Sequence, residues 1–339
     1  MTTAKPKTDL SSILSRIDKH RIYIIFVVIF VFMALFAPKF FNPFNLTTIT
    51  KTMAMTACVG IGFTIVMICG QLDLSIGTVI TLAGIIGLGL KQYVGYELSV
   101  PLAIVAGSLI GLINGLLVTK AKINSFIVTL GTMTVLQGLI YFVTGGNSIA
   151  LSTPDAFAVS DFLSWKMMPM ITPRVLITLV LVIVAQIVLA RTRFGRNFYM
   201  VGGNKSTAWL AGINTDRTII LAFILSGTTA AIGGVLFAME SSAATLNLGT
   251  NSLMYVISAT IIGGTAMSGG KGGVIQTFVA IMALEILYDG VILFGLGNEV
   301  KIFLAGLILA LVVLYEAFAI YKHEKTVGQR PELLKELNR

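Results

Sequence analysis

The sequence predicts an all-α integral membrane protein, a polytopic bundle of about ten transmembrane helices with two glycine-rich helix breaks. Of the 339 residues, 56% are hydrophobic and 12% are charged, whereas soluble domains carry about 25% charged residues. A spanning helix needs about 20 mostly apolar residues. Much of the chain is therefore committed to lipid, and the 34 glycines suit helices that approach one another closely.

Ten spans follow from the apolar runs, and the basic residues between them set their orientation. We expect spans at residues 22–37, 52–69, 76–92, 99–118, 126–144, 174–190, 217–239, 252–267, 273–291 and 301–320. With the N-terminus inside, 18 of the 24 lysines and arginines fall in inside segments, as the positive-inside rule requires. This orientation explains the net charge of +9 without a nucleic-acid partner. No small-x-small cleavage site follows the first run, so we interpret it as a retained helix.

The spans divide the chain into three regions. We expect a cytoplasmic N-terminal segment at 1–21, a transmembrane domain at 22–320 and a cytoplasmic C-terminal tail at 321–339, so both termini face the cytoplasm. In the first segment, one helical face carries apolar residues after possible caps at Thr8 and Asp9, namely Leu10, Ile13, Leu14 and Ile17. This spacing predicts an interfacial helix on the membrane surface, with a disordered basic tail as the alternative.

The first helix break separates the second and third spans at 70–77, where the chain reads G-Q-L-D-L-S-I-G. An acidic side chain between two spanning segments costs free energy and is usually kept for transport. The candidate residues of the translocation pathway here are Gly70, Gln71, Asp73, Ser75 and Gly77.

The second break, at 263–273, resembles the first. Gly263, Ser268 and Gly270 correspond to the first glycine, the serine and the last glycine of the first break. These three residues and Gly264 are further candidates for the translocation pathway. Paired interruptions in two halves of a membrane chain are typical of discontinuous transporter helices, whose freed backbone groups can bind a polar, uncharged solute such as a sugar. The alternative is two tight cytoplasmic turns with Asp73 and Ser75 as helix caps.

The second break is not a nucleotide-binding loop. A Walker A motif reads G-x-x-x-x-G-K-[ST]. Here Thr265 stands at the position of the first glycine, and Gly272 stands at the position of the serine or threonine after Lys271. The histidines, His20 and His323, both lie in the cytoplasmic flanks. We therefore expect no ATP hydrolysis, no other catalytic residue and no histidine metal site in this chain.

A short helix is expected in the cytoplasmic loop 191–217. Asn204 can serve as its N-cap and Gly212 as its C′ residue, while Gly202 and Gly203 let the chain turn sharply into it. A delimited surface helix of this kind is a contact for a partner or an ordinary loop helix. The long outside connection 145–172 is either a simple link or a docking surface for an external partner.

Five motifs in order make the chain resemble the permease subunits of bacterial ATP-binding-cassette (ABC) importers for monosaccharides, of the ribose, galactose and xylose type. They are G-x-x-D-L-S-x-G at 70–77, F-I-V-T-L-G-T at 126–132, T-R-F-G-R-N at 192–197, G-G-N-x-x-x-A-x-x-x-G-I at 202–213 and G-G-T-x-x-S-G-G-x-G at 263–272. The resemblance extends from about 45 to 320. One departure is Gln71, where many relatives have a second glycine.

The resemblance implies a function for the whole chain. It implies a bacterial inner-membrane permease subunit that imports a sugar by alternating access, with a coupling helix that fits a groove of the ATPase. The implied coupling residues are Asn204, Ala208, Leu210, Gly212 and Ile213. The implied partners are two ATPase subunits, which hold the ATP and Mg, a periplasmic sugar-binding protein, and a second permease chain, identical or paralogous.

Two alternatives stay open on the sequence. An ion-coupled secondary transporter would need ionisable groups inside the bundle, for which Glu285, Asp289 and Glu240 are the further candidates. A permease for branched-chain amino acids would share the architecture, but few charges within the spans could recognise a zwitterion.

Overall fold

The computed structural model describes residues 10–165, 171–314 and 317–318. Thr8, Asp9, His323 and the predicted tail 321–339 therefore lie outside the described residues. Helices dominate the described chain: α1 Leu10–Phe36, α2 Pro43–Ile68, α3 Ile76–Gly89, α4 Lys91–Thr119, α5 Ser125–Thr144, α6 Pro154–Ser164, α7 Pro173–Arg191, α8 Arg193–Gly203, α9 Lys205–Leu210, α10 Thr215–Ser241, α11 Leu248–Ile262 and α12 Val274–Leu293. A further helix follows over residues 298–314.

The predicted all-α membrane class is confirmed. Among the described residues, 6 helices are long and apolar enough to cross a membrane, namely α2, α4, α5, α7, α10 and α12. The apolar stretches Arg21–Phe36, Ile76–Gly89 and Leu248–Ile262 are shorter. These lengths do not by themselves fix the total of about ten spans.

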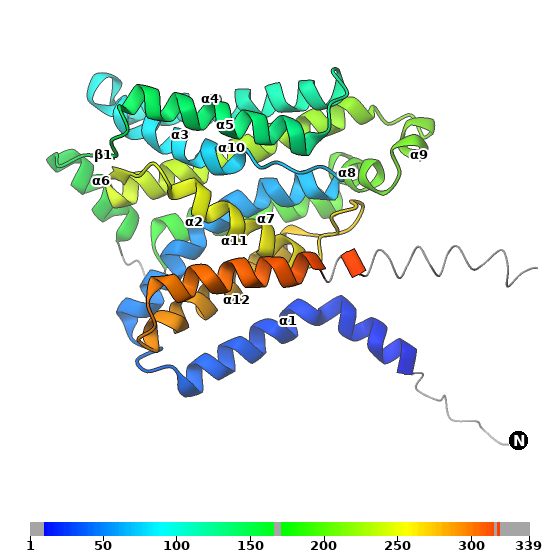
Figure 1. Cartoon of the computed structure of the whole chain (residues 1–339), viewed down its shortest axis with the longest axis horizontal. Coiled ribbons are helices and arrows are strands. Elements are labelled where there is room, and N and C mark those ends of the chain that lie inside the picture. Colours follow the sequence, from blue (N-terminus) through cyan, green and yellow to red (C-terminus); the bar gives the residue numbers. More distant parts are fainter. Residues whose placement is uncertain (1–9, 166–170, 315–316, 319–339) are drawn as a thin grey trace, which may run out of the picture.

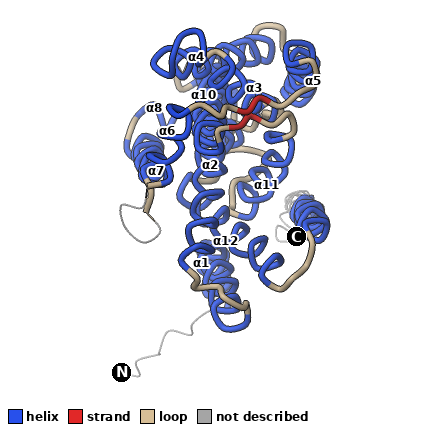
Figure 2. Tube along the Cα trace, turned by 90° about the vertical axis from the view of Figure 1, so that its left-hand side faces the viewer, coloured by secondary structure: helices blue, strands red, loops and turns tan. Residues whose placement is uncertain are grey.

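The long helices run side by side, so the bundle has two ends (Figure 1). One end, here called the α6 end, carries α6 and the two strands, β1 Ile149–Ala150 and β2 Ala243–Ala244, which pair antiparallel. The other, the α9 end, carries α8 and α9. Seen from its side, the bundle has α4 and α5 at one extreme and α1 at the other, with α10 and α2 between them (Figure 2). Helix α10 packs against α2, α3 and α4, and α12 packs against α1, α2 and α11.

Asparagine caps explain where several helices begin. Asn42 accepts a hydrogen bond from Phe44 N at 2.9 Å, and Pro43 occupies the first helical position of α2. Asn124 caps α5 in the same way through Phe126 N, again at 2.9 Å. Each cap satisfies a backbone amide that has no partner within its own helix, and it thereby fixes the first turn.

The largest differences from the expected boundaries fall in four helices. Helix α1 is continuous from Leu10, so the interfacial helix and the first span form one bent helix (Figure 1). Helix α2 begins at Pro43 instead of 52, because Lys51 is neutralised by an ion pair inside the bundle rather than ending the helix. Helix α4 starts at Lys91, with a kink at Gly95 where φ is 70°. Helix α11 ends at Ile262, five residues early, because the second break begins there.

Candidate functional site

The first break lies inside the bundle. Helix α2 ends at Ile68, and α3 begins only at Ile76. With 14 residues, α3 is about 21 Å long, shorter than the roughly 30 Å apolar core of a bilayer. Asp73 and Ser75 are each 1% exposed, so the break is a buried polar interruption rather than a solvated surface turn.

Three donors bind the carboxylate of Asp73. Ser75 donates from its hydroxyl at 2.5 Å and from its backbone amide at 3.1 Å, both to Oδ1. Ser226 of α10 donates its hydroxyl to Oδ2 at 2.7 Å. The side chain of Ser75 does not cap α3. The expected capping role therefore falls to Asp73, which closes the local turn and joins the break to α10.

The network continues into α4 and α5. Asn114 of α4 donates to the Ser75 hydroxyl at 2.9 Å and accepts from Thr132 of α5 at 2.6 Å. The backbone amide of Leu72 donates to the Ser125 hydroxyl at 3.2 Å. Side chains of α4, α5 and α10 thus bind the first break by hydrogen bonds. A membrane interior rarely contains such polar groups without a function.

Gly70 and Gln71 lie where the break opens at the α9 end. They line a cleft of about 600 Å³ together with residues of α4, α5 and the α9 region, among them Asn124 and Lys205. Gly70 has φ 70°, a conformation that favours glycine. Gly77, the second residue of α3, faces Gly249 of α11, where an added Cβ would lie 3.1 Å from the Gly249 carbonyl oxygen.

The second break is built from backbone rather than from buried side-chain contacts. Gly264, Gly269 and Gly270 have φ values of 93°, 86° and 75°, which side chains rarely adopt. Gly263 forms the C-cap of α11. Ser268 is exposed, so the expected correspondence with the buried Ser75 does not extend to its surroundings.

The two breaks are in direct contact. The backbone amide of Gly270 donates to the carbonyl oxygen of Ile68, the last residue of α2, at 2.8 Å. Gly202 and Gly203, expected to allow a sharp turn, instead end helix α8 beside both breaks. Their lack of side chains permits a close approach of backbones, and the chain turns at Asn204 instead.

Helix α9 has the predicted ends. Asn204 accepts from Thr207 N at 2.9 Å as N-cap. At the other end Gly212 N donates to Trp209 O at 2.9 Å and Ile213 N donates to Ala208 O at 3.0 Å, with φ 80° at Gly212. This is a Schellman motif, which fixes the length of the helix at Lys205–Leu210.

The two faces of α9 differ. Ala208 is 1% exposed and packs with Ile213 against the bundle. Trp209 and Leu210 are 68% and 77% exposed. Of the expected coupling residues, Leu210 and Gly212 thus point outward, whereas Ala208 seats the helix. Trp209 was not among the expected coupling residues, although a tryptophan within a short capped loop helix was a signal in the sequence.

Asp216 ties α9 to its neighbours. Its carboxylate lies 2.9 Å from the Lys120 ammonium at the end of α4 and 3.8 Å from that of Lys205 in α9. Because all three side chains are partly exposed, these pairs orient the loop more than they stabilise it.

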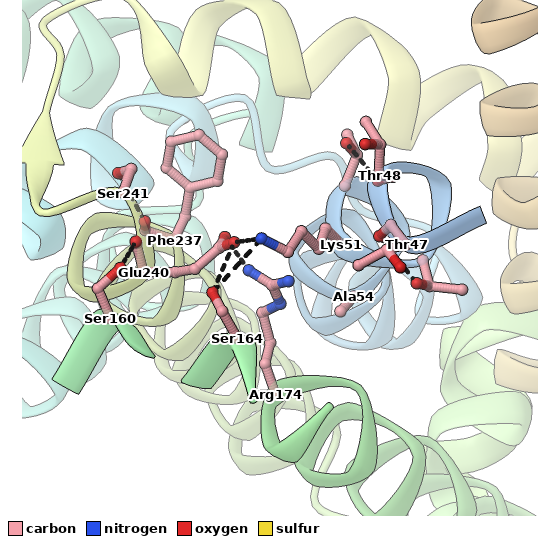
Figure 3. A network of polar contacts seen from close by, with 12 residues as sticks. Thr47, Thr48, Lys51, Ala54, Ser160, Ser164, Arg174, Phe237, Glu240 and Ser241 are labelled. Carbon is pink, nitrogen blue, oxygen red and sulfur yellow. Dashed lines mark hydrogen bonds and ion pairs between the residues drawn. The ribbon is translucent and has the colours of Figure 1, made fainter. Parts of the chain in front are cut away.

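A second charged cluster lies at the α6 end and was not foreseen as a unit (Figure 3). Glu240 of α10 forms ion pairs with Arg174 of α7 and, at 2.7 Å, with Lys51 of α2. Ser160 and Ser164 of α6 donate to the backbone and the carboxylate of Glu240. Lys51 and Arg174 lie at the edges of the expected spans 52–69 and 174–190. The cluster fastens α6 to the bundle.

The remaining acidic candidates lie in α12. Glu285 is 6% exposed and accepts a hydrogen bond from Thr56 of α2 at 3.2 Å. Lys301 lies over the rings of Tyr255 and Tyr288, at 5.8 and 5.9 Å. The hydrogen bond from Thr56 to Glu285 therefore links α2 to α12. Within the described part of the chain, no group of three or more His, Cys, Asp or Glu residues is placed to hold a metal.

The bundle has helices long enough to cross a membrane, and its broken helices surround a buried polar network. This architecture is that of a membrane permease. The chain belongs to the family described as the permease component of branched-chain amino acid transport systems, whose model matches residues 45–313. It is a multi-pass membrane protein of that family.

Its relatives include three permeases with similar lengths. The chain is 28% identical to the ribose import permease protein of Haemophilus influenzae, over 88% of this chain and 93% of that protein. It is 30% identical to the L-arabinose transport system permease protein of Escherichia coli, over 91% and 93%. It is 30% identical to the ribose import permease protein of Bacillus subtilis, over 85% and 89%. None of the solved structures matches this chain.

Proposed function

We propose that this chain is the translocating subunit of an ATP-driven importer of a sugar, most simply a monosaccharide. Relatives along nearly the whole chain are permeases for ribose and L-arabinose, and the buried network around Asp73 is built from hydroxyl and amide groups, the kind that bind sugar hydroxyls. A branched-chain amino acid is less suited, because its two charges would each need a partner in the pathway.

Helix α9 carries the proposal. It is rigidly capped at both ends, it exposes Trp209 and Leu210, and it follows directly on the end of α8, which adjoins both helix breaks. Exposed aromatic and aliphatic anchors on a rigid helix suit insertion into a groove of a partner. We assign Asn204, Ala208, Leu210, Gly212 and Ile213 to coupling with an ATPase, together with Trp209.

The partners divide between the two ends of the bundle. Two ATPase subunits, which hold the ATP and Mg, would bind the α9 end, where both termini would also face the cytoplasm of a bacterial inner membrane. A periplasmic sugar-binding protein would dock at the α6 end, and a second permease chain would complete the pathway. The chain itself then supplies no catalytic residue and needs no cofactor.

Alternating access would change the packing at the breaks. We assign the pathway to Gly70, Gln71, Asp73, Ser75 and Gly77 in the first break. In the second break we assign it to Gly263, Gly264, Ser268 and Gly270. Closure of the ATPases on ATP would displace α9, and the bundle would rock about the two interruptions.

The decisive experiment is to purify this chain from its native membrane with its partners and to identify the sugar held by the co-purified binding protein. We expect an ATPase and a sugar-loaded binding protein. If no ATPase co-purifies, the importer proposal fails. A catalytically inactive ATPase separates this proposal from ion coupling, because uptake that persists with it but collapses with an uncoupler would establish a secondary transporter.

A further inference from the structure

Three chain segments meet at the α9 end without intervening side chains. They are the end of α2 with the first break, at Ile68–Gly70, the second break at 269–270, and the last turn of α8 at 202–203. Gly270 N donates to Ile68 O at 2.8 Å. A Cβ on Gly202 would lie 1.8 Å from Ile68 O and 2.7 Å from Gly270 N. The third segment therefore touches both partners of that hydrogen bond.

Gly269 of the second break is also in close contact with both other segments. A Cβ on Gly269 would lie 2.7 Å from Gly70 N and 2.8 Å from Gly202 O. One turn earlier in α8, the Tyr199 hydroxyl donates to Gly272 O at 3.0 Å. Thus both helix breaks and α8 contact one another through their backbones, and Tyr199 adds one side-chain tie.

The junction is continuous with α9. Helix α8 ends at Gly203, and Asn204 alone separates it from α9. Phe198 and Val201 of α8 are 0% and 3% exposed and pack in the same cluster as Ile68 and Ala208. A displacement of α9 must therefore move the last turn of α8, and backbones in van der Waals contact have no flexible side chain to absorb that movement.

We propose that Gly202 is a positioning residue that transmits displacement of α9 to both helix breaks at once. This inference rests on the proposed ATP-driven function. A junction of three backbones would make the two breaks respond together. Side-chain contacts, by contrast, could yield to the movement of α9 through changes of rotamer.

Two adjacent glycines provide a matched test. Gly202→Ala places a Cβ well inside 3.0 Å of Ile68 O, whereas a Cβ on Gly203 meets only Gly270 Cα, at 4.0 Å. Both positions lie in the last turn of the same helix. We expect the Gly202→Ala complex in proteoliposomes to hydrolyse ATP yet transport about tenfold less sugar per ATP, with Gly203→Ala close to wild type.

Tyr199→Phe is the second variant, because Gly202→Ala could prevent assembly. It removes only the hydroxyl bonded to Gly272 O, and we expect it to assemble and to lower the sugar transported per ATP severalfold. If the Gly202→Ala complex assembles and transports as much sugar per ATP as the wild type, the inference is overturned. If Gly202→Ala does not assemble, a wild-type ratio of sugar to ATP in Tyr199→Phe overturns it. Failure of the proposed function is distinguishable, because the wild-type chain would then show no ATP-dependent uptake.

Discussion

The Ser226 hydroxyl donates to Oδ2 of Asp73 at 2.7 Å, and this bond joins the middle of α10 to the first helix break. The two residues lie 153 positions apart in the chain. Helix α10 packs against α2, α3 and α4, so the bond fixes the break against the central helix of the bundle.

Asp73→Ala should reduce uptake without abolishing association with the ATPase. The substitution leaves the Ser75 and Ser226 hydroxyls without their shared acceptor, so the shape of the break changes while α9 is untouched. Uptake into vesicles and co-purification of the ATPase measure the two effects. Ser226→Ala is the control that removes one donor, at about 1–3 kcal/mol of unfolding free energy. Loss of expression in Asp73→Ala would instead indicate a capping role alone.

Gly212→Pro should uncouple ATP hydrolysis from uptake. The φ of 80° at Gly212 is inaccessible to proline, and the bond from Gly212 N to Trp209 O would be lost. A Cβ added to Gly212 would meet no atom within 4 Å. Gly212→Ala therefore tests the positive φ alone, and it should lower the free energy of unfolding by about 1 kcal/mol. The ratio of sugar transported to ATP hydrolysed is the measurement. Unchanged uptake in Gly212→Pro would argue against coupling through α9.

Replacing Trp209 and Leu210 together by alanine should weaken ATPase binding while leaving the isolated chain as stable as before. Both side chains are largely exposed, so their loss removes no core contact. Truncation of a hot-spot anchor at an interface typically costs about 2 kcal/mol or more, so loss of both should raise Kd about 1,000-fold. Phe142→Ala is the control, since Phe142 is 85% exposed in the last turn of α5, which leads to β1 at the α6 end. Equal affinities in both variants would exclude the predicted contact.

Glu240→Ala should destabilise the chain by about 3–5 kcal/mol, because Arg174, 1% exposed, would keep a buried charge without its carboxylate. Lys120→Ala breaks the exposed pair with Asp216 and should cost no more than about 1 kcal/mol. Unfolding of the purified chain in detergent compares the two variants. Similar losses in both would show that burial does not decide the strength of the Glu240 cluster.

Asp155, in the first turn of α6, gives a pH-dependent contact. Hydrogen bonds from Lys91 and Thr153 lower the pKa of its carboxyl group from 3.8 to about 2. A depressed folded-state pKa stabilises the fold above pH 3.8, and this contribution is lost as the pH falls toward 2. The difference in midpoint of thermal unfolding between wild type and Asp155→Asn should therefore be constant from neutral pH to about 5 and should then shrink. A constant difference down to the lowest pH would contradict the ion pair.

The sequence by itself determined the membrane class, the two breaks and both ends of α9. These features depend on signals within one short segment: apolar runs, glycines at positive φ, and the pairing of Asn204 with Gly212 as caps. Local propensity and hydropathy act over a few residues, so a pattern in one segment suffices to predict them.

Only the tertiary structure decided which segments meet. Gly202 was expected to allow a turn, yet it is a glycine because Ile68 O and Gly270 N leave no room for a Cβ. Lys51 and Arg174 lie at the edges of their expected spans, yet both pair with Glu240 inside the bundle. No periodicity along the chain relates residues so far apart. Their proximity follows from helix packing, and it is this packing that joins α9 to both breaks.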